Sequence, residues 1–136
     1  MSWPLILIYA CRTRKIAILI GDGFDMAGYE GLKASLLAGS AVVMTVGTRK
    51  SRVVSSSGNA VSPDLHFEGD RSTGYDAVVI PGGKHVEALS KNGRVIHWIR
   101  EAFGHCKAIG AFGEGTSTFL SSRPYITHHI RVLRVV

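Results

Sequence analysis

The sequence predicts a doubly wound α/β fold with a mostly parallel sheet, and three observations support this prediction. Continuous apolar runs occur at residues 16–20, 77–80 and 108–112, and each is closely followed by glycine. Runs of this kind are typical of parallel strands that are buried on both faces. Segments with apolar residues at helical spacing lie between them. A length of 136 residues allows one domain with a single core.

The first part of the chain predicts a βαβ unit. Its strand, helix and second strand are expected at residues 15–20, 26–38 and 41–46. Tyr29, Leu32 and Leu36 recur at helical spacing and support the helix. A parallel pair connected in this way has a right-handed crossover.

The pattern resumes after an irregular stretch at residues 48–75. Within it, Val53-Val54 and Ala60-Val61 flank a Ser-Gly-Asn turn and predict a short hairpin. The strand at 77–80 then ends at Pro81-Gly82-Gly83, where a helix begins. One face of a helix that ends near residue 104 is formed by Val95, Trp98, Ile99, Ala102 and Phe103.

The net charge of +6 does not predict a nucleic-acid-binding protein. Residues 16–115 contain as many acidic as basic side chains. The excess lies at the two ends, in Arg12, Arg14, Lys15, Arg123, Arg131 and Arg134. A nucleic-acid footprint is instead clustered on one folded face. No apolar run approaches the ~20 residues that span a bilayer. We therefore expect neither a nucleic acid nor a membrane as a partner.

The two cysteines, Cys11 and Cys106, form neither a disulfide framework nor a zinc-binding spacing. They indicate reduced thiols, a cytoplasmic protein and no metal site. Residues 1–13 contain an apolar stretch without the charged segment that precedes it in a secretory signal. We expect them to be an atypical leader that is not exported, followed by one domain over residues 14–136.

Two glycine-containing turns are candidate ligand sites. Gly21-Asp22-Gly23 resembles the start of a dinucleotide fingerprint, but position 26 is Met26 where that motif needs glycine. A tight strand-to-helix turn explains it better, and a nucleotide- or flavin-binding module stays an alternative. The N–H groups of Gly82 and Gly83 can form an anion cradle with Gly21, Asp22 and His85. A turn without a ligand is the competing interpretation.

The strand at 108–112 leads into a third turn, Gly113-Glu114-Gly115, at the place where α/β enzymes hold a nucleophile. Gly113 tolerates a strained backbone but has no side chain. Cys106 precedes the turn by seven residues, which in a strand is about 23 Å. Ser117 and Ser121 belong to no Gly-x-Ser-x-Gly elbow. The turn is therefore either an active site or the vestigial frame of one, and its residues Gly113, Glu114 and Gly115 supply no catalytic side chain at the tight position.

The histidines add no metal site to this picture. His97 lies off the apolar helix face and is expected to face solvent. His128 and His129 are adjacent, so in a strand their rings point to opposite faces. Past the third turn, we expect a short helix from Thr116 and an edge strand from residue 130.

Three stretches resemble the C-terminal domain of large-subunit catalases. They are Arg14–Asp25 (RKIAILIGDGFD), Ala77–Val86 (AVVIPGGKHV) and Val95–Gly115 (VIHWIREAFGHCKAIGAFGEG). The resemblance implies a flavodoxin-like fold of the class I glutamine amidotransferase-like type, close to PfpI-type proteases and deglycases. It covers about residues 14–115. Residues 116–136 do not follow the pattern, which leaves a truncated C-terminal end as an alternative.

In the PfpI-type enzymes the elbow carries a cysteine, and an acid after the first strand supports its thiol. The resemblance places Gly113 at the cysteine position and Glu114 after it. The acid position falls near Ala27, with Asp25 close by. Without a thiol no general base can restore covalent catalysis, so the resemblance implies a degenerate active site.

The resemblance therefore implies a non-catalytic domain with a structural, subunit-contact or chaperone-like role. The parent family decomposes hydrogen peroxide with haem, which belongs to other domains, so no cofactor is expected in this chain. The implied partners are further copies of the chain, catalase-type subunits or unfolded protein chains. The alternative is a PfpI-type hydrolase or deglycase.

Overall fold

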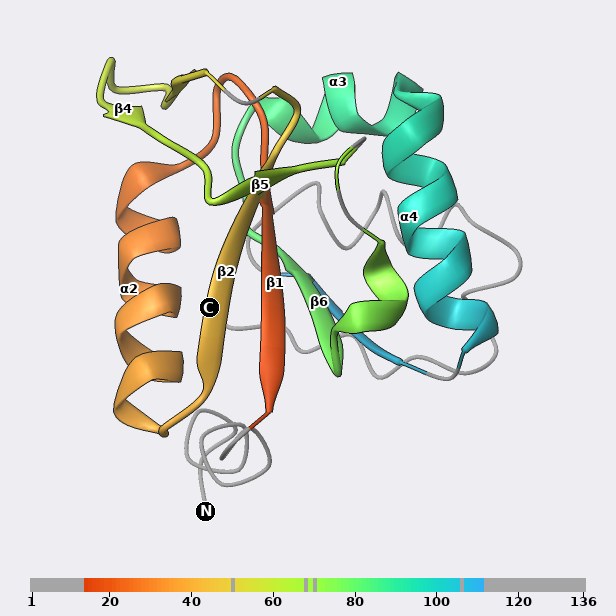
Figure 1. Ribbon diagram of the computed structural model, residues 1–136. Helices are drawn as coiled ribbons and strands as arrows, with labels where there is room; N and C mark the ends of the chain where they lie inside the picture. The colour runs from red at the N-terminus through yellow and green to blue at the C-terminus, as the bar shows by residue number, and fades with distance from the viewer. Residues whose placement is uncertain (1–13, 50, 68, 70, 106, 112–136) are drawn as a thin grey trace.

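The computed structural model describes residues 14–49, 51–67, 69, 71–105 and 107–111. Five parallel strands form its main sheet, and helices pack on both sides (Figure 1). From one edge to the other, the strands are β5 (Leu65–His66), β2 (Val42–Gly47), β1 (Lys15–Ile20), β6 (Ala77–Ile80) and β7 (Ala108–Ala111). This arrangement confirms the predicted doubly wound α/β fold.

The central strand is β1, and its position follows from its composition. All five residues of Ile16–Ile20 are 0% exposed, as expected for a continuous apolar run covered on both faces. β1 pairs with β2 along its whole length, from Lys15↔Val42 to Ile20↔Gly47. It pairs with β6 on its other side. The ends of β1 and β6 therefore lie side by side.

The helix α2 (Met26–Ala38) covers one face of the sheet and agrees with the predicted limits. Asp25 caps its first turn by accepting a hydrogen bond from the Gly28 N–H at 3.3 Å, and Gly39 caps its end. The three residues predicted from helical spacing are buried in the core on this side, together with Phe24.

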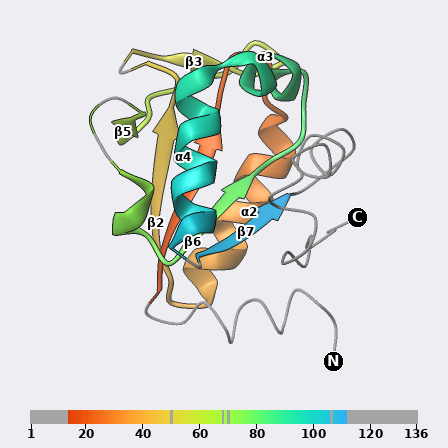
Figure 2. The same cartoon turned by 90° about the vertical axis from the view of Figure 1, so that its right-hand side faces the viewer.

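The opposite face is covered by two helices, α3 (His85–Lys91) and α4 (Gly93–Gly104). In Figure 2, α4 crosses in front of the sheet and α2 lies behind it. Asn92 ends α3 and caps α4, since its side-chain oxygen accepts from the Arg94 N–H at 3.0 Å. The predicted apolar face of α4 is confirmed by the buried Val95, Trp98, Ile99 and Ala102, with Phe103 partly buried.

The stretch between β2 and β6 contains the predicted hairpin, β3 (Val53–Val54) with β4 (Ala60–Val61). It also contains two elements that the sequence pattern did not indicate. β5 pairs with β2 in the main sheet, and a short 3-10 helix, η1 (Ser72–Gly74), packs against α4. Elements of two or three residues are too short to show a period, so tertiary pairing alone defines them.

The outer edge of β2 is only partly covered. β5 pairs with Val46 and Gly47, and no described strand pairs with the earlier part of that edge. Val42 is 51% exposed there, and Leu37 at the end of α2 is 52% exposed. Within the described part of the chain, no helix combines the length and apolar composition needed to cross a membrane.

Candidate functional site

Two of the predicted turns meet at the carboxyl end of the sheet. Because β1 and β6 are parallel neighbours, the turn at 21–25 lies beside the turn at 81–85. The Asp25 N–H donates to the Gly82 carbonyl at 2.9 Å, and the Lys84 N–H donates to the Gly23 carbonyl at 2.9 Å. The fold therefore joins two turns that are about sixty residues apart in the chain.

This contact requires glycine at Gly83. Its φ of +126° is unfavourable for residues with a side chain, and its backbone forms a bridge with Phe24. A Cβ at this position would lie 2.6 Å from the Asp25 nitrogen and 2.7 Å from the Gly23 oxygen. Both neighbours are backbone atoms, so neither can rotate away.

His85 connects the same two turns through its ring. The side chain is 0% exposed. Its Nδ1 accepts a hydrogen bond from the Gly21 N–H at 3.0 Å, and its Nε2 lies 2.6 Å from the Pro81 carbonyl oxygen. Nδ1 must be unprotonated to accept, so the proton is on Nε2, which donates to Pro81.

Burial lowers the pKa of His85 from its ordinary value of 6.5. Hydrogen bonds with the backbone of Pro81 and Gly82 act in the opposite direction and offset part of this effect. The ring is therefore neutral at pH 7, and both of its nitrogens already contact the protein backbone.

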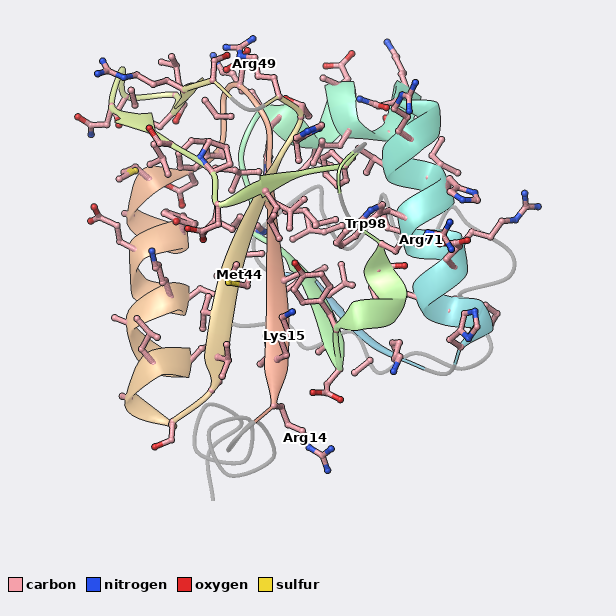
Figure 3. All side chains as sticks on the ribbon, in the orientation of Figure 1. Arg14, Lys15, Met44, Arg49, Arg71 and Trp98 are labelled. Atoms are coloured by element: carbon pink, nitrogen blue, oxygen red, sulfur yellow. The ribbon has the colours of Figure 1, made fainter. Side chains whose placement is uncertain are left out.

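Asp22 attaches the hairpin to the turn after β1. Its Oδ1 accepts from Arg49 Nη2 and from the Val54 N–H, each at 3.0 Å. The Gly23 N–H donates to the Val54 carbonyl at 2.8 Å, and the Ser56 N–H donates to the Phe24 carbonyl at 3.0 Å. Figure 3 shows Arg49 at this end of the molecule and Arg14 at the opposite end. The sequence contained no signal for this attachment.

All five predicted cradle residues lie around these turns, so the fold brings Gly21, Asp22, Gly82, Gly83 and His85 into one region. The Gly21 N–H is already bonded to His85, and the Asp22 carboxylate is already bonded to the Val54 N–H of the hairpin. Binding of an anion or ligand there stays a prediction. Among the described residues, no three His, Cys, Asp or Glu side chains gather closely enough to hold a metal ion.

The position expected for the supporting acid falls near Ala27, with Asp25 close to it. Ala27 is exposed, and Asp25 caps α2. β7 ends at Ala111, which pairs with Ile80 at the last residue of β6. The third turn, Gly113-Glu114-Gly115, lies outside the described residues, as do Cys106, Ser117, Ser121, His128 and His129. His97 is exposed, which confirms its predicted solvent-facing position.

The family model described as the DJ-1/PfpI family matches residues 14–129. The chain belongs to the DJ-1/PfpI family. The match includes both turns described above and continues past residue 115, where the resemblance quoted from the sequence ends.

Within this family, the chain is similar to one part of several catalases. It is 52% identical to Catalase-1 of Neurospora crassa over 104 residues, which cover 76% of this chain and 14% of that protein. It is 47% identical to Catalase A of Emericella nidulans over 107 residues, or 75% of this chain and 14% of the relative. These matches confirm the predicted resemblance to a domain of large-subunit catalases. The chain spans about one seventh of the length of these relatives.

Solved structures of DJ-1/PfpI proteins share the fold. Oxidized DJ-1 of Toxoplasma gondii superposes with a TM-score of 0.76 at 17% identity, covering 85% of this chain and 64% of that chain. A ThiJ/PfpI domain protein from Brachyspira murdochii gives 0.75 at 18% identity, covering 91% and 70%. These similarities confirm the flavodoxin-like architecture.

Proposed function

We propose that this chain is a non-catalytic DJ-1/PfpI domain of the type found in large-subunit catalases, with a structural role in contacts between subunits. The 52% identity to part of Catalase-1 supports this proposal most strongly. The match covers 14% of that relative, so peroxide decomposition belongs to a longer parent protein and not to this chain alone.

The residues at the carboxyl end of the sheet support a non-catalytic role. A nucleophile needs a side chain at the elbow, and Gly113 has none. A supporting base needs a free lone pair or carboxylate. Both ring nitrogens of His85 are bonded to backbone groups, so this ring offers no free lone pair. Asp22 pairs with Arg49 and accepts from the Val54 N–H of the hairpin, which is a structural use of a carboxylate.

The proposed partners are further copies of the chain or catalase-type subunits, in the cytoplasm. A chaperone-like binding of unfolded protein chains is the second form of this role. Haem belongs to the parent protein's other domains under this proposal, and the chain by itself binds none.

The test uses the purified chain in two measurements. Peroxide decomposition and Soret absorbance are recorded after incubation with haem, and sedimentation velocity is recorded alone and with a catalase-type subunit that lacks this domain. We expect turnover no faster than with haem alone, and association with itself or with the subunit. Turnover accompanied by a Soret band from bound haem contradicts the proposal. A monomer that neither joins the subunit nor suppresses aggregation of heat-unfolded protein also contradicts it.

A PfpI-type hydrolase or deglycase is separated from this proposal by thiol chemistry. Such an enzyme needs a reactive cysteine. Iodoacetamide labelling is therefore mapped by mass spectrometry in the wild type, in Cys106→Ser and in Cys11→Ser as the matched control. We expect no hydrolysis or deglycation in any of the three. Activity that is lost on labelling Cys106, and absent only from Cys106→Ser, would establish the enzyme instead.

A further inference from the structure

The ring of His85 occupies a place where a second proton cannot be added without breaking a contact. Nδ1 accepts from the Gly21 N–H at 3.0 Å, and Nε2 already donates to the Pro81 carbonyl at 2.6 Å. Protonation of Nδ1 places two N–H donors against each other. The Gly21 N–H must then lose its acceptor.

The surroundings of the ring do not compensate for a positive charge. The side chain is fully buried, and the ring of Phe24 packs beside it with its centroid 6.4 Å away. Two uncharged side chains also lie close to Gly21, because a Cβ on Gly21 would be 3.3 Å from Leu89 and 3.5 Å from Thr48. A buried charge without a partner is strongly unfavourable.

Charged groups occur on each element that packs against His85, but the hydrogen bonds and ion pairs found for them lead elsewhere. Asp22 is bonded to Arg49 and to the Val54 N–H, and Asp25 caps α2. On α3, Glu87 and Lys91 pair with each other at 3.6 Å, and both are exposed. Lys84, on the turn itself, is exposed. Among the described residues, therefore, no carboxylate makes an ion pair with the ring.

We propose that His85 is a proton-operated latch at the carboxyl end of the sheet. In its neutral form it joins the turn after β1 to the turn after β6. When it is protonated, the bond to Gly21 breaks and the turn at 21–25 loosens where Asp22 anchors the hairpin. The inference goes beyond the proposed function. Its test measures the exchange of backbone amides, and not activity or association.

The direction of the pH effect follows from linkage. The folded chain binds a proton at His85 less readily than the unfolded chain does, because the folded pKa lies below 6.5. The stability that neutral His85 contributes is therefore complete above about pH 6.5 and is lost as the pH falls through the folded pKa. The hydrogen bond between Gly21 and His85 is therefore favoured at neutral pH and broken at acidic pH.

The experiment is an NMR titration of the full chain from pH 7.5 to 4.5. Ring nitrogen shifts report the tautomer and protonation of His85, and amide exchange reports the contact at Gly21. We expect an Nε2-protonated ring at neutral pH. Protection of the Gly21 amide, corrected for intrinsic exchange, should stay constant above about pH 6.5. Below that pH it should fall about tenfold for each further unit of decrease until the ring is protonated. The amide of Ile18, in the middle of β1, serves as the internal reference and should keep its protection.

Two variants make the test specific. His85→Asn retains an acceptor near the position of Nδ1 but cannot be protonated, so the Gly21 transition should disappear. His97→Asn removes an exposed histidine from α4 and should leave it unchanged. The latch is refuted if Gly21 keeps its protection while the ring protonates, or if His85→Asn retains the transition. Simultaneous loss of protection at Ile18 also refutes it, because the event is then global unfolding. If His85→Asn does not fold, the wild-type titration decides the question. The proposal holds if the Gly21 amide reaches its lowest protection at the pH where the His85 ring nitrogens become protonated, and it is refuted if the two transitions occur at different pH values.

Discussion

Substitution of Gly83 by alanine tests the close backbone contact between the turn after β1 and the turn after β6. The structure places the new Cβ 2.6 Å from the Asp25 nitrogen, 2.7 Å from the Gly23 oxygen and 2.9 Å from the Phe24 carbonyl carbon. Real Cβ atoms essentially never approach other atoms this closely, so the two turns must separate. The φ of +126° adds backbone strain that glycine does not have.

The expected loss of stability combines these two effects. A residue with a side chain in a sparsely populated backbone region costs about 1–3 kcal/mol. Forcing an extra methyl group into a packed site costs about 1–3 kcal/mol more. We therefore expect Gly83→Ala to lower the free energy of unfolding by about 4 kcal/mol, a large part of the roughly 5–15 kcal/mol of a typical domain.

The assay is urea unfolding followed by tryptophan fluorescence, because Trp98, one of the two tryptophans, is only 2% exposed. Gly31→Ala is the matched control, because Gly31 lies inside α2 and a Cβ there has no atom within 4 Å. Alanine favours a helix interior, so this variant should gain about 0.5–1 kcal/mol. If Gly83→Ala unfolds at the same urea concentration as the wild type, the close contact between the turns is wrong. A loss in Gly31→Ala as large as that in Gly83→Ala would show that the effect is not specific to the contact.

Three further substitutions have distinct expected outcomes. Asp22→Ala should change the free energy of unfolding by less than about 1 kcal/mol, because the ion pair of Asp22 is half exposed. Amide exchange at Val54 should become faster, because the Val54 N–H loses its acceptor, and unchanged exchange there would contradict the attachment of the hairpin. Tyr29→Phe should cost about 1–2 kcal/mol in urea unfolding, because Thr45 loses a buried hydrogen bond of 2.7 Å, and a neutral result means that this bond contributes nothing. Val42→Lys should raise the protein concentration at which light scattering begins, because it places a charge on a partly unpaired strand edge, and stability should change little. Scattering that begins at a lower concentration than in the wild type would contradict this.

Local patterns predicted most of the regular elements. The helix α2 has the predicted limits, and the main strands agree to within one residue where they are described. β2 begins at Val42, one residue later than expected, and the segment after β6 divides at Asn92 into two helices. Periodic burial is a property of consecutive residues, so it can be read from the sequence.

The sequence also identified the candidate site residues and the catalase resemblance, but not how those residues interact. Gly113, Glu114 and Gly115 stay predictions, and so does ligand binding at the turns. The attachment of the hairpin through Asp22 and the Val54 N–H had no signal, because a hydrogen bond across 32 positions leaves no local period.

The sequence by itself therefore determined the fold class, the core strands, the main helices and the family. Only the tertiary structure decided that His85 bonds to Gly21 across 64 positions and that Gly83 must be glycine because another turn approaches it. The physical reason is the parallel pairing of β1 with β6. It brings two distant strand ends together, and the resulting contacts depend on both turns at once.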